Sequence, residues 1–158
     1  FVGTELRYFI LLTNLVSAQS PSLPKPASDK ATFFGAAELT AAVNTAVVQP
    51  QGRVATVLDT PNYVVNLRKN DQVTPANMHP TTAEFYIIRA GSATLVTGGT
   101  LKDPTRTANG DWNGSGVTDG ERRTVKTGDA VLIPAGVAHT WENIEGSISY
   151  YNIRFLGK

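Results

Sequence analysis

The chain has 158 residues and no cysteine, with 14 lysines and arginines against 13 aspartates and glutamates. This length suffices for one sizeable core, so we expect a single domain, and the lack of cysteine excludes disulfides, thiolate zinc sites and a cysteine nucleophile. The balanced charge, with no polybasic patch, argues against nucleic acid or an anionic membrane as a partner.

Residues 1–18 fit a secretory signal peptide. Arg7 precedes a short apolar stretch, and Val16 and Ala18 supply the small residues that a signal peptidase recognises. The alternative is a strand or helix packed on the domain, which the acidic Glu5 and the lack of a starting Met favour. Removal predicts a secreted or periplasmic protein, and retention a cytoplasmic one. In either case the apolar stretch is too short to span a bilayer.

Two segments precede the predicted strands. Residues 19–30 are rich in proline and serine and predict an extended tether, so the N-terminal segment covers residues 1–30 and the domain residues 31–158. Within residues 35–48, apolar side chains recur every four positions among strong helix formers, which predicts one amphipathic helix on the outside of the domain. Its apolar positions are Leu39, Val43 and Val47.

From residue 53 onward, short runs rich in valine, isoleucine, threonine and aromatic residues alternate with glycine, proline, asparagine and aspartate. Such runs predict brief strands of an antiparallel barrel or sandwich. We place eight strands at residues 53–58, 62–68, 84–89, 92–98, 122–128, 130–134, 138–143 and 148–155.

The glycine-rich residues 98–121 interrupt this succession of short strands and turns. A loop of this length is either functional or mobile. Its Trp112 either covers the mouth of a pocket or packs against a partner subunit, and we favour packing.

The chain has two histidines, His79 in NMHPTTAEF and His139 in VLIPAGVAHTWEN. Because alternate residues of a strand share a face, Asn77 is expected to point the same way as His79, and Trp141 the same way as His139. The two imidazoles therefore meet inside the domain if their strands are neighbours.

Glu84 follows in the next strand, with Tyr86 on its face. If the strands adjoin, His79, Glu84 and His139 converge. Two imidazoles and one carboxylate with open positions suit Fe(II), and the same set can hold Zn, Mn, Ni or Cu. The alternative is a pair of ordinary surface or core histidines and a solvated glutamate.

The stretch GDAVLIPAGVAHTWEN carries a glycine, a proline, a second glycine, a histidine and an asparagine at fixed intervals. It resembles the second motif of the cupin superfamily, G-x5-P-x-G-x2-H-x3-N. Every defined position is matched, by Gly128, Pro134, Gly136, His139 and Asn143.

The stretch DQVTPANMHPTTAEFYIIRAG resembles the first cupin motif, G-x5-H-x-H-x3-4-E-x6-G, at His79, Glu84 and Gly91. It departs from the motif where Asp71 replaces the opening glycine and Asn77 replaces the first histidine. The usual set of three histidines and one glutamate loses one member, because an amide oxygen is a weak or indirect ligand.

The resemblance covers roughly residues 53–156 and implies an all-β fold, a cupin-type antiparallel β-barrel (jelly roll) with one or two short N-terminal helices. It also implies one divalent transition metal, with Fe favoured and Cu, Mn, Ni or Zn as alternatives. The expected partners are a small-molecule substrate, with neither nucleic acid nor membrane, and a second copy in a homodimer.

Three functions are compatible with these residues. The first is an oxidoreductase such as a dioxygenase, in which His79, Glu84 and His139 bind the metal. The second is a metal-dependent isomerase, lyase or cyclase with Glu84 as general base. The third is a secreted, non-catalytic module that binds a metal or ligand. Tyr86 and Trp141 either line the pocket or fill the barrel.

Overall fold

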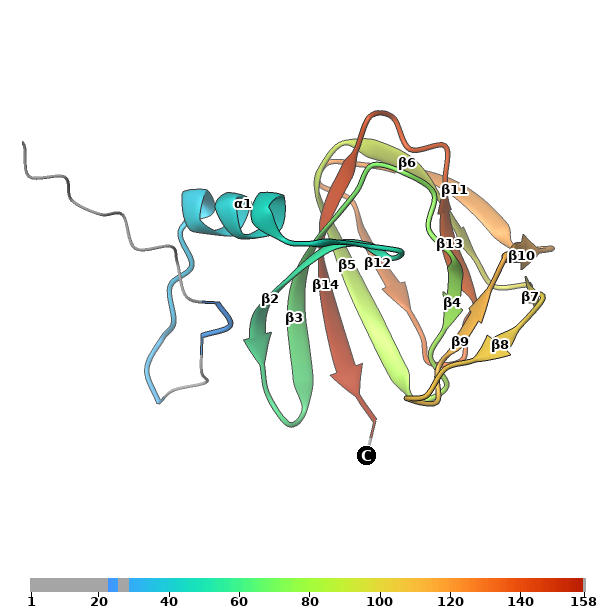
Figure 1. Ribbon diagram of the computed structural model, residues 1–158, viewed down its shortest axis with the longest axis horizontal. Helices are drawn as coiled ribbons and strands as arrows, with labels where there is room; N and C mark the ends of the chain where they lie inside the picture. The colour runs from blue at the N-terminus through green and yellow to red at the C-terminus, as the bar shows by residue number, and fades with distance from the viewer. Residues whose placement is uncertain (1–22, 26–28, 158) are drawn as a thin grey trace, which may run out of the picture.

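The computed structural model describes residues 23–25 and 29–157, in which two six-stranded antiparallel sheets face each other beside one helix and a two-stranded ribbon (Figure 1). The first sheet contains β1 (Val48–Gln49), β2 (Gly52–Asp59), β3 (Tyr63–Asn70), β5 (Thr82–Ala90), β12 (Ala130–Ile133) and β14 (Ile148–Leu156). The second contains β4 (Ala76–Met78), β6 (Ser92–Thr97), β8 (Thr105–Arg106), β9 (Trp112–Gly114), β11 (Glu121–Lys126) and β13 (His139–Glu142). The ribbon pairs β7 (Thr100–Lys102) with β10 (Gly116–Thr118).

The strand orders are β1-β2-β3-β14-β5-β12 in the first sheet and β11-β6-β13-β4-β9-β8 in the second. All eight predicted strands are present, which confirms the all-β prediction and its jelly-roll layers. Within the described ranges the strand pairings give two layers and do not close them into one continuous barrel.

The prediction of a long loop over residues 98–121 is wrong, because this segment contains β7, β8, β9 and β10. These strands have two or three residues each, too few for the alternation of apolar and polar residues to appear in the sequence. Gly99 lies at a tight approach between them, since a Cβ there would come within 2.0 Å of the Thr118 carbonyl oxygen.

The main core lies between the two sheets. On β5 the inward positions Glu84, Tyr86 and Ile88 are buried and alternate with the more exposed Phe85 and Ile87, as a strand with one covered face requires. The apolar part of this core takes side chains from both sheets, namely Tyr86, Ile88, Ala93, Leu95, Val125, Ile133, Trp141, Ile148 and Tyr150.

The helix α1 (Ala36–Thr45) packs on the outer face of β2 and β3, as predicted for the outside of the domain. Leu39 and Val43 are buried against Leu67, but Val47 lies beyond the helix and is 74% exposed. The predicted helix is therefore too long at its C-terminal end. The run of β-branched residues after Ala46 disfavours helix, and the residue before Pro50 is restricted to extended geometry.

The predicted signal peptide, residues 1–18, lies outside the described residues, so secretion stays a prediction. Residues 19–30 were predicted to form an extended tether, but the described residue Lys25 contacts the domain. The Lys25 amide donates to the Val57 carbonyl at 3.1 Å, and its ammonium lies 2.9 Å from Glu38 Oε1, so this part is held against the domain. No helix within the described ranges has both the length and the apolar character needed to cross a bilayer.

Replacement of Leu67 by alanine is expected to destabilise the protein by about 2–5 kcal/mol, because the side chain is fully buried between β3 and α1. The matched control is Leu132→Ala on β12, where the leucine is 59% exposed and little change is expected. Urea unfolding of both variants provides the measurement. Equal destabilisation of the two would contradict the packing of α1 described above.

Candidate metal centre

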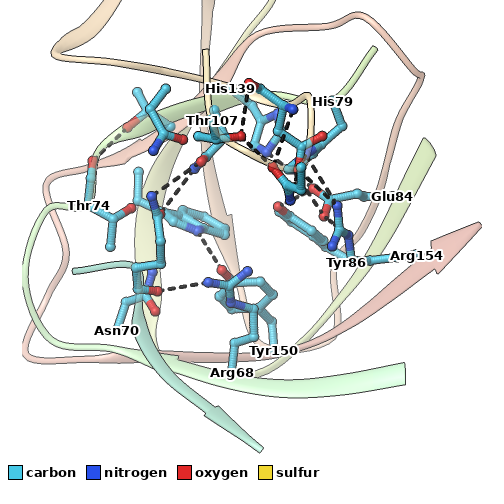
Figure 2. A pocket seen from close by; sticks show the side chains of 17 residues that line it. Arg68, Asn70, Thr74, His79, Glu84, Tyr86, Thr107, His139, Tyr150 and Arg154 are labelled. Carbon is cyan, nitrogen blue, oxygen red and sulfur yellow. Dashed lines mark hydrogen bonds and ion pairs between the residues drawn. The ribbon is translucent and has the colours of Figure 1, made fainter. Parts of the chain in front are cut away.

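Two histidines and one glutamate from the two facing sheets converge in a cavity of about 300 Å³ (Figure 2). His79 directly follows β4, His139 begins β13, and Glu84 lies on β5. The strands β4 and β13 are paired with Asn77 opposite His139, which brings the two imidazoles together as the sequence predicted. We call His79, Glu84 and His139 the triad.

The ligand atoms of the triad all lie within 4.8 Å of one another. His139 Nε2 is 3.2 Å from Glu84 Oε2, and His79 Nε2 is 3.6 Å from Glu84 Oε1. Ligands held about 2.1 Å from a tetrahedral zinc ion lie about 3.4 Å apart, so the two histidine–glutamate distances match a coordination shell. Its residues therefore fit a divalent transition metal.

Backbone geometry fixes the orientation of the His139 ring. Its Nδ1 lies 3.1 Å from the Val137 carbonyl oxygen, which can only accept a hydrogen bond. A proton on Nδ1 completes this bond, and Nε2, which faces Glu84, is the ring nitrogen available to a metal. A metal-binding histidine needs this arrangement.

Asp111, in the turn before β9, orients the second ring. Its Oδ2 lies 2.9 Å from His79 Nδ1. Arg154 Nη2 is also 3.2 Å from that nitrogen, but a nitrogen that donates to a carboxylate cannot accept from arginine. We assign the charge-assisted bond to Asp111, which leaves His79 Nε2 free for a metal.

Glu84 is 1% exposed and lies among hydrogen-bond donors. The Tyr86 hydroxyl donates to Oε2 at 2.8 Å, Asn152 Nδ2 donates to Oε1 at 3.0 Å, and Arg154 Nε lies 3.2 Å from Oε1. Burial alone raises the pKa of Glu84, but the hydrogen bond and charge of His139, the charge of His79 and the Asn152 bond outweigh it. The pKa therefore lies far below its ordinary value, and Glu84 is ionised.

The pKa of His79 is lowered, first by burial and then by the positive charges of Arg154 and His139, against the opposing effect of Glu84 and Asp111. At neutral pH this ring is therefore neutral, as a metal ligand must be. Tyr86 is buried, which together with the Glu84 carboxylate raises its pKa well above 10 and keeps its hydroxyl protonated.

Metal affinity is expected to be constant above about pH 7 and to fall as protons compete for the imidazoles below about pH 6.5. The lowered pKa of His79 keeps this ring neutral to a lower pH than a free imidazole, while Glu84 stays ionised across the range. Zn²⁺ dissociation constants measured between about pH 5 and pH 8 test this expectation. An affinity that rises as the pH falls would contradict an imidazole site.

Asn77 lies beside the triad but is held by other groups. Its Nδ2 donates to Gln51 Oε1 at 3.1 Å and to the Pro75 carbonyl at 3.0 Å, and its Oδ1 accepts from Gln51 Nε2 at 3.3 Å. The amide oxygen expected to act as a weak or indirect ligand thus already has a donor. In this arrangement Asn77 supports the cavity wall and leaves coordination to the triad.

Tyr86 and Trp141 both line the cavity, as the alternation of their strands predicts. Their rings stack with centroids 5.9 Å apart, and Trp141 Nε1 donates to the Tyr150 hydroxyl at 3.0 Å. Trp112 is not among the residues that line this cavity, and its packing against a partner subunit stays a prediction. It packs within its own chain beside Met78, with Arg106 over its ring at 5.9 Å.

Searches against protein-family models and curated proteins find no match. Solved structures do match. An uncharacterized conserved protein with a double-stranded beta-helix domain from Klebsiella pneumoniae is 15% identical, covering 82% of this chain and 93% of that chain at a TM-score of 0.57. KdgF from Halomonas sp. is 16% identical, covering 71% and 86% at 0.51, and a protein from Thermus thermophilus is 14% identical, covering 72% and 91% at 0.51.

The chain has the cupin fold. At these identities the likeness is one of architecture, and it agrees with the paired β4 and β13 that carry the two cupin-like motifs. The triad comes from the two cupin-like stretches of the sequence, and its residues could hold a metal ion.

Three polar residues of this site were not predicted from the sequence: Asp111, Asn152 and Arg154. The last two share the inward face of β14 with Tyr150, and the register places Asn152 opposite Tyr86 and Arg154 opposite Glu84. The alternation of the run ISYYNIRF contains this signal, because two polar side chains on a buried face indicate a site. Asp111 gives no such signal, since its position depends on the fold of residues 98–121.

Replacement of Asp111 by asparagine is expected to weaken metal binding about 10-fold to 100-fold, because the bond that orients His79 loses its charge. The matched control is Asp103→Asn, since Asp103 lies in the same segment and accepts from Ser115 Oγ at 2.6 Å. Competition titration with a chelator measures both affinities. Equal affinities in the two variants would contradict a role for Asp111.

Proposed function

We propose that this protein is a metal-dependent oxidoreductase of the dioxygenase type, which binds one Fe(II) and acts on a small molecule in the cavity. The observation that carries the proposal is the triad, in which two imidazole nitrogens and one ionised, buried carboxylate lie within 4.8 Å of one another and line the same cavity. Two histidines and one carboxylate with open positions are the ligand set of non-haem Fe(II) oxygenases.

The electrostatics of Glu84 support a ligand over a general base. A general base works best when its pKa lies near the working pH, whereas the pKa of Glu84 is far below its ordinary value. A weakly basic carboxylate that is ionised and held by Tyr86 and Asn152 is suited to coordination. This favours the oxidoreductase over an isomerase, lyase or cyclase that uses Glu84 as its base.

The number of ligands supports an enzyme over a binding module. Structural metal sites are normally closed by four protein ligands, and catalytic sites keep positions open. The triad supplies three, and Asn77, the nearest amide, is engaged by Gln51. Fe(II) bound here would supply the reduction of dioxygen, and the remaining positions would face the cavity.

The other cavity residues would position the substrate and control protons. Tyr86 stays protonated and donates to Glu84 Oε2, which keeps that oxygen from taking up a proton. Trp141 and Tyr150, both buried, add aromatic surface to the cavity lining against which a substrate would pack.

The proposal is tested by anaerobic reconstitution with Fe(II), Zn²⁺, Mn²⁺, Ni²⁺ or Cu²⁺, followed by elemental analysis. We expect one metal per chain, and nitric oxide added to the Fe(II) form is expected to give the electron paramagnetic resonance signal of an iron nitrosyl with an open position. Oxygen consumption is then measured with candidate substrates. Metal binding with neither nitric oxide binding nor oxygen consumption would favour the non-redox or binding functions, and failure to bind any metal would overturn the proposal.

The homodimer and the secreted or periplasmic location are part of this proposal as well. An exposed edge strand needs cover, and β12 lies at the edge of its sheet with Leu132 59% exposed. Sedimentation of the purified protein measures the oligomeric state.

A further inference from the structure

The cavity contains a second cationic side chain, Arg68, that the triad does not use. Arg68 lies on β3 opposite Tyr150, and its sequence neighbour Leu67 points the other way, into the contact with α1. The guanidinium therefore lines the cavity, and Figure 2 shows it beside Tyr150, on the side away from the two histidines.

The two arginines of the cavity differ in their partners. Arg154 lies 3.2 Å from Glu84 Oε1 and 3.6 Å from Asp111 Oδ2. Arg68 donates from Nη2 to the Gln51 carbonyl at 2.9 Å, and its buried Nε has no hydrogen-bond partner. Among residues 23–25 and 29–157, no carboxylate forms an ion pair with Arg68.

With a metal bound, the net charge of the cavity would be positive, like that of Arg68. Arg68 and Arg154 are balanced by Glu84 and Asp111, so a divalent cation at the triad would leave an excess of two positive charges. A charge held away from water is costly unless a counter-charge pairs with it. A ligand that completes this cavity should therefore be an anion.

We propose that Arg68 binds a carboxylate of the substrate, so that the substrate is a small carboxylic acid whose other end faces the triad. This inference rests on the proposed function for the position of the metal. The planar guanidinium matches a carboxylate in shape, and no carboxylate of the described residues is paired with it. A volume of about 300 Å³ limits the acid to a small molecule.

The test uses the dicarboxylates malonate, succinate, glutarate and adipate, each compared with its monoamide. Isothermal titration is carried out with Zn²⁺-loaded protein and with metal-free protein. The wild type is expected to bind the best-fitting dicarboxylate about tenfold or more tightly than its monoamide, because the amide loses a charge-assisted bond. Arg68→Gln is expected to remove this preference, and Arg68→Lys to retain part of it.

The matched control is Arg89→Gln. Arg89 is also half-buried and lies in a strand of the same sheet, but it contacts Thr40 of α1 outside the cavity, so the preference should remain. Thermal unfolding establishes that each variant folds. A preference that persists in Arg68→Gln would overturn the proposal, as would tighter binding of inorganic phosphate or no dicarboxylate binding by the wild type.

Metal uptake is measured separately, without any carboxylate. If the wild type takes up no metal, the proposed function fails, and the titration of the metal-free protein still tests Arg68. If metal uptake is normal and the dicarboxylate preference is absent, only the inference on Arg68 fails.

Discussion

His139→Ala should abolish stoichiometric metal binding while the protein stays folded. Its Nε2 is one of three ligand atoms, and the two that remain do not form a stable shell. The apolar core takes its stability from other side chains of both sheets, so the metal-free variant should stay folded, at a lower unfolding temperature than the metal-free wild type because buried Glu84 loses a partner. Elemental analysis after reconstitution and circular dichroism give the two measurements.

The matched control for His139→Ala is Asn113→Ala. Asn113 lines the same cavity and forms no hydrogen bond or ion pair with the triad, so this variant should keep its metal. Full metal occupancy in His139→Ala would place the metal elsewhere in the protein and remove the basis of the proposed function.

Glu84→Gln is expected to reduce metal affinity by at least about 100-fold and to destabilise the metal-free protein by about 3–5 kcal/mol. The amide is nearly isosteric, but it loses the charge that the metal needs. It also turns an NH₂ group toward one of the two donors, Tyr86 or Asn152, and leaves Arg154 without its closest carboxylate. Urea unfolding at neutral pH and chelator competition measure the two effects.

The pH dependence of this loss has a defined sign. The folded-state pKa of Glu84 is lowered from 4.5, so its contribution is present above about pH 4.5 and is lost as the pH falls toward the folded-state value. The difference between wild type and Glu84→Gln should therefore shrink in acid. Glu142→Gln, at an exposed pair with Arg122, is the control and should cost little at any pH. A similar loss in both variants would argue against a special role for Glu84.

The sequence predicted the long strands well because each has a full period of alternation and a turn at its end. β5 and β14 show this most clearly, with buried and more exposed residues in turn. The short strands β7, β8, β9 and β10 were missed because pairing between distant residues, rather than local preference, determines them. The end of α1 was placed too late because Val47 continues the helical spacing after the helix has ended.

The triad was predictable because two spaced motifs place both histidines on neighbouring strands. The residues around the triad were harder to predict from the sequence. The bond from Asp111 to His79 depends on how residues 98–121 fold back over the cavity, and the engagement of Asn77 by Gln51 joins residues 26 positions apart. Arg68 and Arg154 look like ordinary basic residues until the register of β3 and β14 turns both inward.

The triad draws its members from both layers, with the histidines on the side of β4 and β13 and the glutamate on β5. A cation held by all three would act as a cross-link between the layers. Such a cation binds the folded chain in preference to the unfolded one. The unfolding temperature should therefore rise with the free metal concentration. Scarcity of metal in the surroundings would then lower the lifetime of the protein as well as its activity.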